Sequence, residues 1–413
     1  MMNWLQRLIP LSVIAILGGR VHAVPEIPQG SVSVSQCSSR VVTINYTLAN
    51  EDAIVTVDVL TNGVSIGDAN LTYFTGDAFR RVSPGARTIQ WLPLKAWPGH
   101  KITDRSVSYV LKAWSLDNPP DYLVADLTNP NTVNYYVSES QLLRGVSDDV
   151  YKTAKLVMRR IPAAHVRWRM GSPCSEESRK PNETAHIVSL TDDYYIGIYE
   201  LTQGQYAAIA GENPPTGRTG DDVHLCPVDA VSHKTLRGTQ DVWPSDGHVI
   251  TDAACWLYKL RQHTGVSFDL PTSAQWEFAC RAGTGTALYT GADVSAEAEN
   301  ALYPIAWTQY TTDKIMPVGL KVPNAFGLYD MLGNVWEICL DQSSSGHNYY
   351  EDSEIDPCGP NPSPARTTHV RRGGGRGEKE NYNRSACWHE MAYDDERTGY
   401  YTGFRLWAPL PQL

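Results

Sequence analysis

The chain has 413 residues, of which 42% are hydrophobic and 19% charged, and its formal net charge is −10 at neutral pH. This length and composition fit a folded protein of two domains, each large enough to bury its own core. The acidic balance argues against nucleic acid and anionic membranes as partners, because both attract basic proteins.

Residues 1–23 have the parts of a secretory signal peptide. Arg7 supplies the positive charge, residues 8–17 form an apolar run, and Val21-His-Ala23 provides a small-residue cleavage site. The apolar run is too short to cross a bilayer, and no other segment approaches the length of a membrane span. We therefore expect cleavage near Ala23 and a mature protein that is secreted or periplasmic.

Residues 24–137 are expected to form an all-β domain. Alternating or β-branched runs occur at residues 32–35, 41–48, 53–60 and 107–114. Asn62-Gly63 after the third run is a strong hairpin signal. Short strands separated by polar turns predict an immunoglobulin-like sandwich. Cys37 is the only cysteine in this region, so the cysteine pair of true immunoglobulin domains is missing. We interpret the domain as an accessory binding or spacing module.

The second domain is expected at residues 151–413, after a polar linker at residues 138–150. Capping boxes that begin helices occur at Thr202/Gln205 and at Thr272/Gln275. A further helix is expected at residues 253–263, with Gly265 ending it. The rest is rich in glycine, proline and short aromatic strands, which predicts an α+β domain with much irregular structure.

Eight cysteines in an exported chain favour disulfides. Their spacing contains no C-x-x-C, which argues against structural zinc and thioredoxin chemistry. Nearness along the chain suggests two pairs, Cys339 with Cys358 and Cys174 with Cys226.

Residues 327–337, GLYDMLGNVWE, place Asp330 and Glu337 on either side of a tight Gly-Asn turn. Two carboxylates, with the carbonyls of Gly333 and Val335 between them, form an all-oxygen ligand set of the kind that Ca²⁺ prefers. Taken alone, the segment is better explained as a turn that carries two solvated acids.

Further blocks accompany this motif. They are MGSP at 170–173, YIGIYELTQ at 195–203, PVDAVS at 227–232, LPTSAQWEFACR at 270–281, PNAFGLY at 323–329 and GFR at 403–405. In this order they resemble the formylglycine-generating-enzyme (sulfatase-modifying factor) family over about residues 150–413. The resemblance implies a C-type-lectin-like α+β fold for the second domain.

Family members that make formylglycine hold copper(I) between two cysteines just after a Gly-Gly-Ser. Soft Cu(I) requires such a thiolate pair. The matching stretch here, residues 373–387, reads GGGRGEKENYNRSAC and has no cysteine before Cys387. Gly375 stands in the place of the family's serine. The sequence therefore argues against a copper centre and leaves no catalytic residue to assign.

The family also has a structural disulfide whose positions correspond to Cys280 and Cys387, and we expect that bridge here. Cys255 matches another family disulfide position, but its partner would be Leu406. We therefore expect Cys255 to be a buried thiol.

The resemblance implies a structural Ca²⁺ held by the Asp330 and Glu337 side chains and by the Gly333 and Val335 carbonyls. A second family site, which aligns less closely, would begin at Asn300 and Ala301 and end near Thr311 and Asp313.

Together these features predict an exported, non-catalytic member of the family that binds extended peptide or glycan, or supports assembly. The former substrate groove, rimmed by Trp336, Arg376 and Trp388, is the expected site. One alternative is an oxidase that converts a sulfatase cysteine to formylglycine, and another is a purely structural surface protein. His389 and Glu390, near the groove, are considered as acid-base partners, and we interpret them as loop residues.

Overall fold

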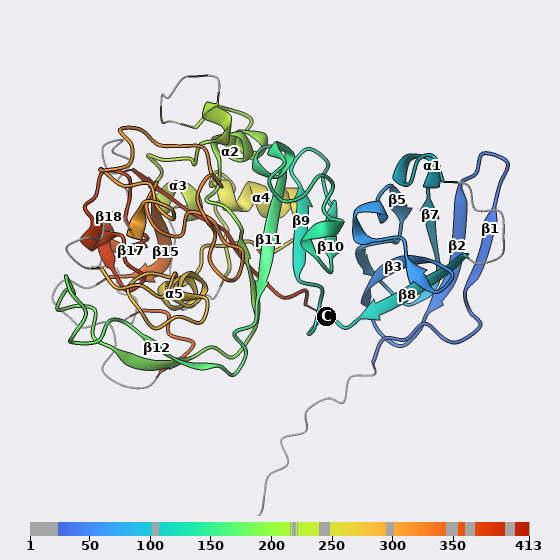
Figure 1. The fold of residues 1–413 in the computed structure, drawn as a ribbon, viewed down its shortest axis with the longest axis horizontal. Coiled ribbons are helices and arrows are strands. Elements are labelled where there is room, and N and C mark those ends of the chain that lie inside the picture. Colours follow the sequence, from blue (N-terminus) through green and yellow to red (C-terminus); the bar gives the residue numbers. More distant parts are fainter. Residues whose placement is uncertain are drawn as a thin grey trace, which may run out of the picture.

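A computed structural model describes residues 24–100, 107–214, 216, 220, 222–238, 248–294, 301–343, 354–359, 368–392 and 401–412. The expected signal peptide and Asn300 lie outside these residues. The described chain forms two lobes that meet near its C-terminus (Figure 1).

The first lobe contains two antiparallel sheets. One sheet has the order β1-β2-β7-β5, and the other has the order β4-β3-β6, with β8 also paired to β3. The strands are β1 (Ser33–Gln36), β2 (Val42–Leu48), β3 (Ala53–Thr61), β4 (Val64–Ser65), β5 (Phe74–Gly76), β6 (Arg80–Val82), β7 (Gly85–Trp91) and β8 (Val107–Trp114). A short helix, α1 (Pro93–Ala96), interrupts this otherwise β-rich region.

The sheets of the first lobe enclose a common apolar core. In β2 the buried and exposed residues alternate, which places Ile44 and Tyr46 inside. The predicted hairpin is confirmed, because Asn62 (φ 50°) and Gly63 (φ 77°) form the two-residue turn between β3 and β4. Two positive φ angles are the requirement that makes Asn-Gly favourable in such a turn.

The second lobe is built on a five-stranded sheet of order β10-β9-β11-β14-β20. Its strands are β9 (Tyr122–Asp126), β10 (Val133–Tyr136), β11 (Lys155–Ile161), β14 (Tyr194–Gly197) and β20 (Trp407–Pro409). β9 and β10 fall in the region expected to belong to the first domain, yet they are hydrogen-bonded into this sheet. Residues 138–150 then contribute Leu142 and Val146 to the core of the second lobe, so this segment is packed chain rather than an open linker.

Two smaller sheets complete the second lobe. One has the order β12-β13-β16 and the other β18-β17-β15-β19. Their strands are β12 (Arg167–Met170), β13 (His186–Ser189), β15 (Trp336–Gln342), β16 (Glu354–Ile355), β17 (Thr368–Arg372), β18 (Trp388–Ala392) and β19 (Thr402–Gly403). Short 3₁₀ turns occur along both lobes. They are η1 (Asp68–Asn70) in the first lobe, and η2 (Glu139–Gln141), η3 (Asp149–Lys152), η4 (Val223–Leu225) and η5 (Glu380–Tyr382) after it.

The helices of the second lobe are α2 (Gln203–Ala210), α3 (His233–Arg237), α4 (Trp256–Thr264) and α5 (Ser273–Arg281). Both predicted capping boxes are present, at the starts of α2 and α5. Gly265 ends α4 in the left-handed conformation, as expected. The start of α4 was predicted three residues too early, because the Asp252 carboxylate accepts the Ala254 N–H and holds that segment in a turn. No helix of the described chain is both long and apolar enough to cross a membrane.

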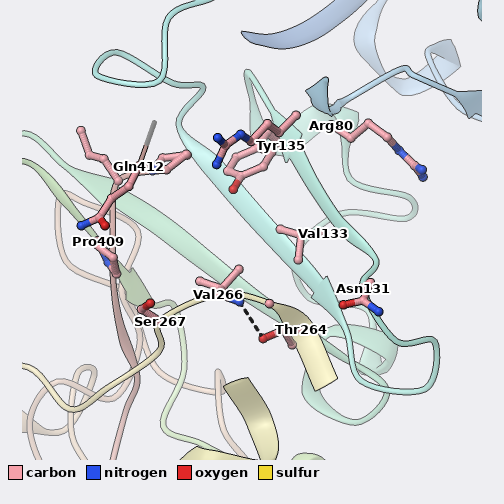
Figure 2. Close-up of a pocket in the computed structure, with 13 residues that line it drawn as sticks. Arg80, Asn131, Val133, Tyr135, Thr264, Val266, Ser267, Pro409 and Gln412 are labelled. Atoms are coloured by element: carbon pink, nitrogen blue, oxygen red, sulfur yellow. Dashed lines mark hydrogen bonds between the residues drawn. The ribbon is translucent and has the colours of Figure 1, made fainter. Parts of the chain in front are cut away.

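The lobes are joined by apolar and backbone contacts. Ile54 of β3 belongs to the same buried cluster as Leu156 and Phe404 of the second lobe. The Tyr135 N–H donates to the Phe79 carbonyl across the junction, at 2.6 Å. Beside these contacts is a cavity of about 480 Å³, drawn in Figure 2, whose lining includes Arg80.

Replacing Thr202 with alanine tests the capping-box account of α2. The Thr202 hydroxyl accepts the Gln205 N–H and donates to the Lys152 carbonyl at 2.6 Å. We expect Thr202→Ala to lower the free energy of unfolding by about 1–2 kcal/mol, measured by urea denaturation. Glu212→Ala, at an exposed position just beyond the same helix, is the control. Equal stability of the two variants would contradict the account.

Candidate functional site

The sheet β18-β17-β15-β19 carries the family-like motif, and its register separates the side chains into two faces. Glu337 is paired with Arg372, and Arg372 with Trp388. One residue along, Arg371 is paired with His389. Because successive strand residues point to opposite faces, the first three lie on one face and Arg371 and His389 on the other. Trp336 belongs to the face of Arg371, which we call the outer face; the other is the inner face.

The turn that precedes β15 is fixed by backbone geometry. Gly333 has a φ of 85°, and a Cβ there would lie 2.4 Å from the carbonyl oxygen of Trp307, so only glycine fits. The Asn334 side chain accepts the Met316 N–H at 3.0 Å and donates to Glu200 at 2.7 Å. The Gly-Asn pair therefore holds the start of β15 against neighbouring loops.

On the inner face, Glu337 is bound by a buried arginine. The Arg405 guanidinium donates to both carboxylate oxygens of Glu337, at 2.6 and 2.7 Å. The Trp276 indole N–H also donates to Glu337, at 2.6 Å. Remaining Arg405 donors reach the carbonyls of Gly197 and Tyr329, each at 3.0 Å. This arginine thus connects β14, β15 and the turn before β15, and Glu337 extends the network to α5 through Trp276.

Two further buried carboxylates face the same arginine. Glu200 accepts the Val335 N–H at 3.1 Å, and Asp330 accepts the Gly319 N–H at 2.6 Å. Burial is the main cause that raises the pKa of Glu200 well above its ordinary value and that of Asp330 to about 6. Asp330 Oδ1 is buried without a hydrogen-bond partner in the described chain. Among these residues negative groups outnumber the single guanidinium.

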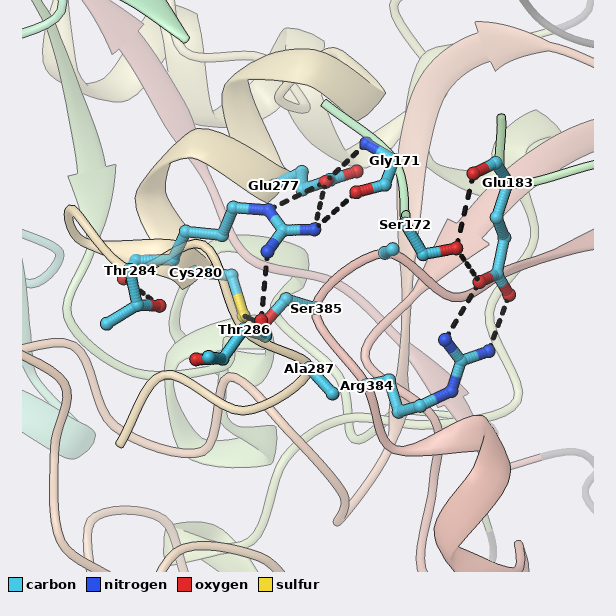
Figure 3. A network of polar contacts seen from close by, with 12 residues as sticks. Gly171, Ser172, Glu183, Glu277, Cys280, Thr284, Thr286, Ala287, Arg384 and Ser385 are labelled. Atoms are coloured by element: carbon cyan, nitrogen blue, oxygen red, sulfur yellow. Dashed lines mark hydrogen bonds and ion pairs between the residues drawn. The ribbon is translucent and has the colours of Figure 1, made fainter. Parts of the chain in front are cut away.

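A second buried ion network includes Glu277 and Glu183, which are drawn in Figure 3. Glu277 of α5 accepts the Gly171 N–H and is paired with Arg281 and Arg372, each at 2.8 Å. Burial, the largest single effect, raises the pKa of Glu277, but Arg281, Arg372 and the Gly171 N–H together hold that pKa below its ordinary value. Nearby, Arg384 is paired with Glu183 at 2.7 Å. The charged groups around Glu277 and the Arg384–Glu183 pair are buried and paired with opposite charges, so their role is structural.

The outer face carries an aromatic and cationic cluster, in which Trp336 and Arg371 are themselves buried. The Arg371 guanidinium lies 4.7 Å from the Trp336 ring centroid, and the indole N–H donates to Glu378 at 3.1 Å. The Tyr382 and His389 rings lie 6.2 and 6.0 Å from Trp336. We call Trp336, Arg371, Tyr382 and His389 the outer cluster. Sequence reasoning missed Tyr382 as a member, since it stands in no motif block.

The structure brings Trp336 and Arg376 close together but separates Trp388 from them. The Arg376 N–H donates to the carbonyl of Asn334, two residues from Trp336. Trp388 is only 5% exposed and packs in the core of the second lobe, with its indole N–H donating to the Asn182 carbonyl. The three residues expected to rim one groove therefore lie on opposite faces of the sheet.

His389 and Glu390 were interpreted as loop residues, but they lie in strand β18. His389 Nδ1 is 3.0 Å from the backbone carbonyl of Glu390. Adjacent strand residues point in opposite directions, so their side chains do not form an acid-base pair.

The structure forms no disulfide among its described residues, which include all eight cysteines. Cys280 and Cys387 are both buried thiols; the Cys280 Sγ lies 3.7 Å from Ser385 Oγ, two residues before Cys387 (Figure 3). Their bridge stays a prediction. Cys255 is buried, as expected. Cys174 and Cys358 do not form the pairs suggested by nearness along the chain.

Of the predicted calcium ligands, Asp330, Gly333 and Val335 lie in the turn before β15, and Glu337 is the second residue of that strand. No group of three or more His, Cys, Asp or Glu side chains suited to a metal ion occurs in the described ranges, but the predicted site requires only two carboxylates and two carbonyls. In the weaker second site, Ala301 is half-buried and Asp313 exposed. Thr311 there donates to the Thr308 carbonyl at 3.2 Å.

Comparison with known proteins identifies the family. Residues 153–409, more than half of the chain, match the model of the sulfatase-modifying factor enzyme 1-like domain. The chain therefore belongs to the formylglycine-generating-enzyme (FGE-sulfatase) family.

Curated relatives match parts of the chain. "Chaperone protein LppX" of Paenibacillus barcinonensis is 26% identical over 210 residues, covering 44% of this chain and 69% of the relative. A formylglycine-generating enzyme of Thermomonospora curvata is 34% identical over 152 residues, covering 34% of this chain and 48% of the relative. The chain thus spans about half the length of that enzyme.

Among solved structures, Treponema denticola variable protein 1 matches 62% of this chain and 96% of its own, at 24% identity and a TM-score of 0.46. PvdO from Pseudomonas aeruginosa matches 62% of this chain and 94% of its own, at 22% identity and a TM-score of 0.45.

The inner arginine gives a direct test of the site. Replacing Arg405 with methionine leaves Glu337 and its neighbouring carboxylates buried without their guanidinium. We expect Arg405→Met to lower the free energy of unfolding by about 3–5 kcal/mol, measured by urea denaturation. Arg144→Met is the control, because Arg144 is 76% exposed in its pair with Asp148 and should change stability by less than about 1 kcal/mol. A similar small change for both variants would disprove the assignment.

Proposed function

We propose that this protein is a non-catalytic member of its family that binds an extended peptide or glycan through the outer face of the sheet β18-β17-β15-β19. The observation that carries the proposal is the glycine-rich turn after β17. No cysteine occurs between Gly373 and Ala386, where catalytic members hold their copper pair.

The thiols that remain do not fit a copper centre. Cys387 is fully buried, and burial raises its pKa to about 11. Burial likewise raises the pKa of Cys280 to about 12. Copper(I) requires thiolates, and a protonated thiol inside the core is a poor ligand. The residues present therefore do not fit the metal, and no oxidation step is assigned to them.

The outer cluster supplies groups suited to binding. His389 is exposed and Tyr382 half-exposed, so ring surface is available beside Arg371. Arg376 lies 4.3 Å from the Tyr401 ring and donates to its hydroxyl. Aromatic rings with arginine donors bind peptide carbonyls and sugar rings alike, by stacking and hydrogen bonding.

We assign the first lobe to an immunoglobulin-like spacer and the second to a C-type-lectin-like fold, in an exported protein.

The second candidate is the oxidase that converts a sulfatase cysteine to formylglycine. Similarity to the formylglycine-generating enzyme of Thermomonospora curvata favours it, at 34% identity over part of the chain. The missing cysteine pair weighs against this candidate. A purely structural surface role is the third candidate, and it predicts self-association without a ligand.

Oxygen consumption with a cysteine-containing peptide separates the first two candidates. For the full protein supplied with copper we expect no oxygen uptake and no aldehyde on the peptide, because the chain lacks the thiolate pair. A catalytic family member serves as the positive control. Turnover of the peptide to an aldehyde would overturn the proposal and establish the oxidase.

We also propose that Ca²⁺ binds at the turn before β15, through Asp330, the carbonyls of Gly333 and Val335, and Glu337. Its support is the unpartnered, buried Oδ1 of Asp330 and the excess of carboxylates around Arg405. Glu337 Oε1 can still coordinate a cation, since each carboxylate oxygen has two acceptor sites and Oε1 accepts one described hydrogen bond, from Arg405. The ion would stabilise the turn and take no part in chemistry.

Thermal unfolding with and without calcium tests this assignment. We expect 1 mM Ca²⁺, about 100 times a micromolar-range Kd, to stabilise the protein by about 2.7 kcal/mol, and a chelator to reverse the effect. Asp330→Ala should abolish the response, whereas Asp313→Ala, which alters only the weaker second site, should leave most of it. A response that survives in Asp330→Ala would place the ion elsewhere.

A further inference from the structure

A second cavity at the junction of the lobes lies apart from the outer cluster. It has a volume of about 700 Å³, within the range of ligand-binding sites. Its walls come from the β2–β3 and β8–β9 connections, the β13–β14 turn, the segment after β16 and the C-terminal residues 409–412. We call it the junction cleft. It shares residues 409–412 with the cavity of Figure 2, so this segment runs between the two.

The rim of the junction cleft is acidic. Asp117, Asp192 and Asp356 line it with exposed side chains, and none of the three forms an ion pair in the described chain. Asp193 also lines it but is neutralised by Arg160 at 3.0 Å. The described lining residues include no lysine or arginine. The rim therefore attracts positive charge.

Asp356 is held in place by neutral donors, and Asp192 shares one of them. Thr191 donates its N–H to Asp356 at 2.8 Å and its hydroxyl to Asp356 at 2.6 Å. The same hydroxyl lies 3.0 Å from an oxygen of Asp192. These hydrogen bonds orient the carboxylates without cancelling their charge, so a cation would meet a preformed pair.

The floor of the cleft is apolar and contains one unsatisfied donor. Leu116, Leu190 and Trp407 line it as buried residues. Trp407 is only 6% exposed and stacks on His248, with ring centroids 4.4 Å apart. Its indole N–H is buried and has no acceptor within the described part of the molecule. A buried N–H without an acceptor is costly, and a ligand carbonyl would satisfy it.

We propose that the junction cleft binds a basic peptide segment. Lysine or arginine charges would lie at Asp117, Asp192 and Asp356, and their aliphatic stems would cover the apolar floor. A main-chain carbonyl would accept the indole N–H of Trp407. That acceptor is the reason for choosing a peptide, because a simple polyamine has the charge but no carbonyl.

The cleft binds rather than reacts. Cys358 and His248 both line it, and His248 Nδ1 is 2.8 Å from Asp269. These three residue types are the ones found in cysteine-based catalytic triads. Burial, followed by nearby Asp341 and Glu354, raises the pKa of Cys358, so the thiol stays protonated. Asp269 is also paired with Arg261 at 3.1 Å and with Arg237, which marks it as a structural centre.

Calorimetric titration of the full protein with acetyl-Lys-Leu-Lys-amide at low salt tests the proposal. We expect saturable binding that the double variant Asp117→Asn/Asp192→Asn weakens by about tenfold, since two rim charges are lost. The double variant Glu177→Gln/Asp222→Asn is the matched control, because it removes two exposed charges away from the cleft. Trp407→Phe keeps an aromatic ring but removes the N–H, and it should also weaken binding.

Two results would overturn the proposal. Equal weakening by both double variants would show that peptide binding depends on the net charge of the protein and not on the cleft. Spermidine binding as tightly as the peptide, without any effect of Trp407→Phe, would show a site for amines instead. Because the cleft shares no residue with the outer cluster, a lack of peptide binding to the cleft would leave the proposed function unchanged. In the same way, an absence of oxidase activity would not support the proposal that the cleft binds peptide.

Discussion

The second lobe depends on one buried guanidinium. Arg405 is fully buried, and its donors reach the Glu337 carboxylate and carbonyls from two other segments. Each of those segments is irregular or short, and the domain has little helix to organise it. A buried charge without partners would be strongly destabilising, so the loops must return to the same positions around it. That constraint fixes the start of β15 and therefore both faces of the sheet that carries the candidate site.

The inner face of the sheet holds a buried structural network, and the outer face is the surface that we propose for binding. Inner-face groups such as Glu277 and Arg372 are buried and paired, and they serve to hold the sheet against α5. Outer-face groups such as Tyr382 and His389 remain at least partly accessible beside Arg371. The stretch where the resemblance places the family's copper cysteines passes Trp336, and here it contains glycine and charged residues instead. A fold can keep its scaffold and lose its reaction, after which the remaining surface is free to bind.

Local signals in the sequence predicted local structure well. The hairpin at Asn62-Gly63 and both capping boxes were correct because each depends on a few adjacent residues. Features that depend on distant pairing were not predictable in this way. The first strands of the second lobe, β9 and β10, were expected in the first domain because alternation does not reveal a strand's partner. Trp388 faces the core because of its register with Arg372, which no motif records. The junction cleft combines segments more than 350 residues apart, from Glu51 to Gln412.

The central claim is that this family member has lost its copper centre while keeping the fold. Anaerobic titration of the purified protein with Cu(I), against a chromophoric chelator, tests it most directly. The account predicts that the chelator keeps the metal, because Cys280 and Cys387 are buried and no cysteine lies between Gly373 and Ala386. Tight binding of one copper per chain would contradict it and would restore the oxidase as the leading function.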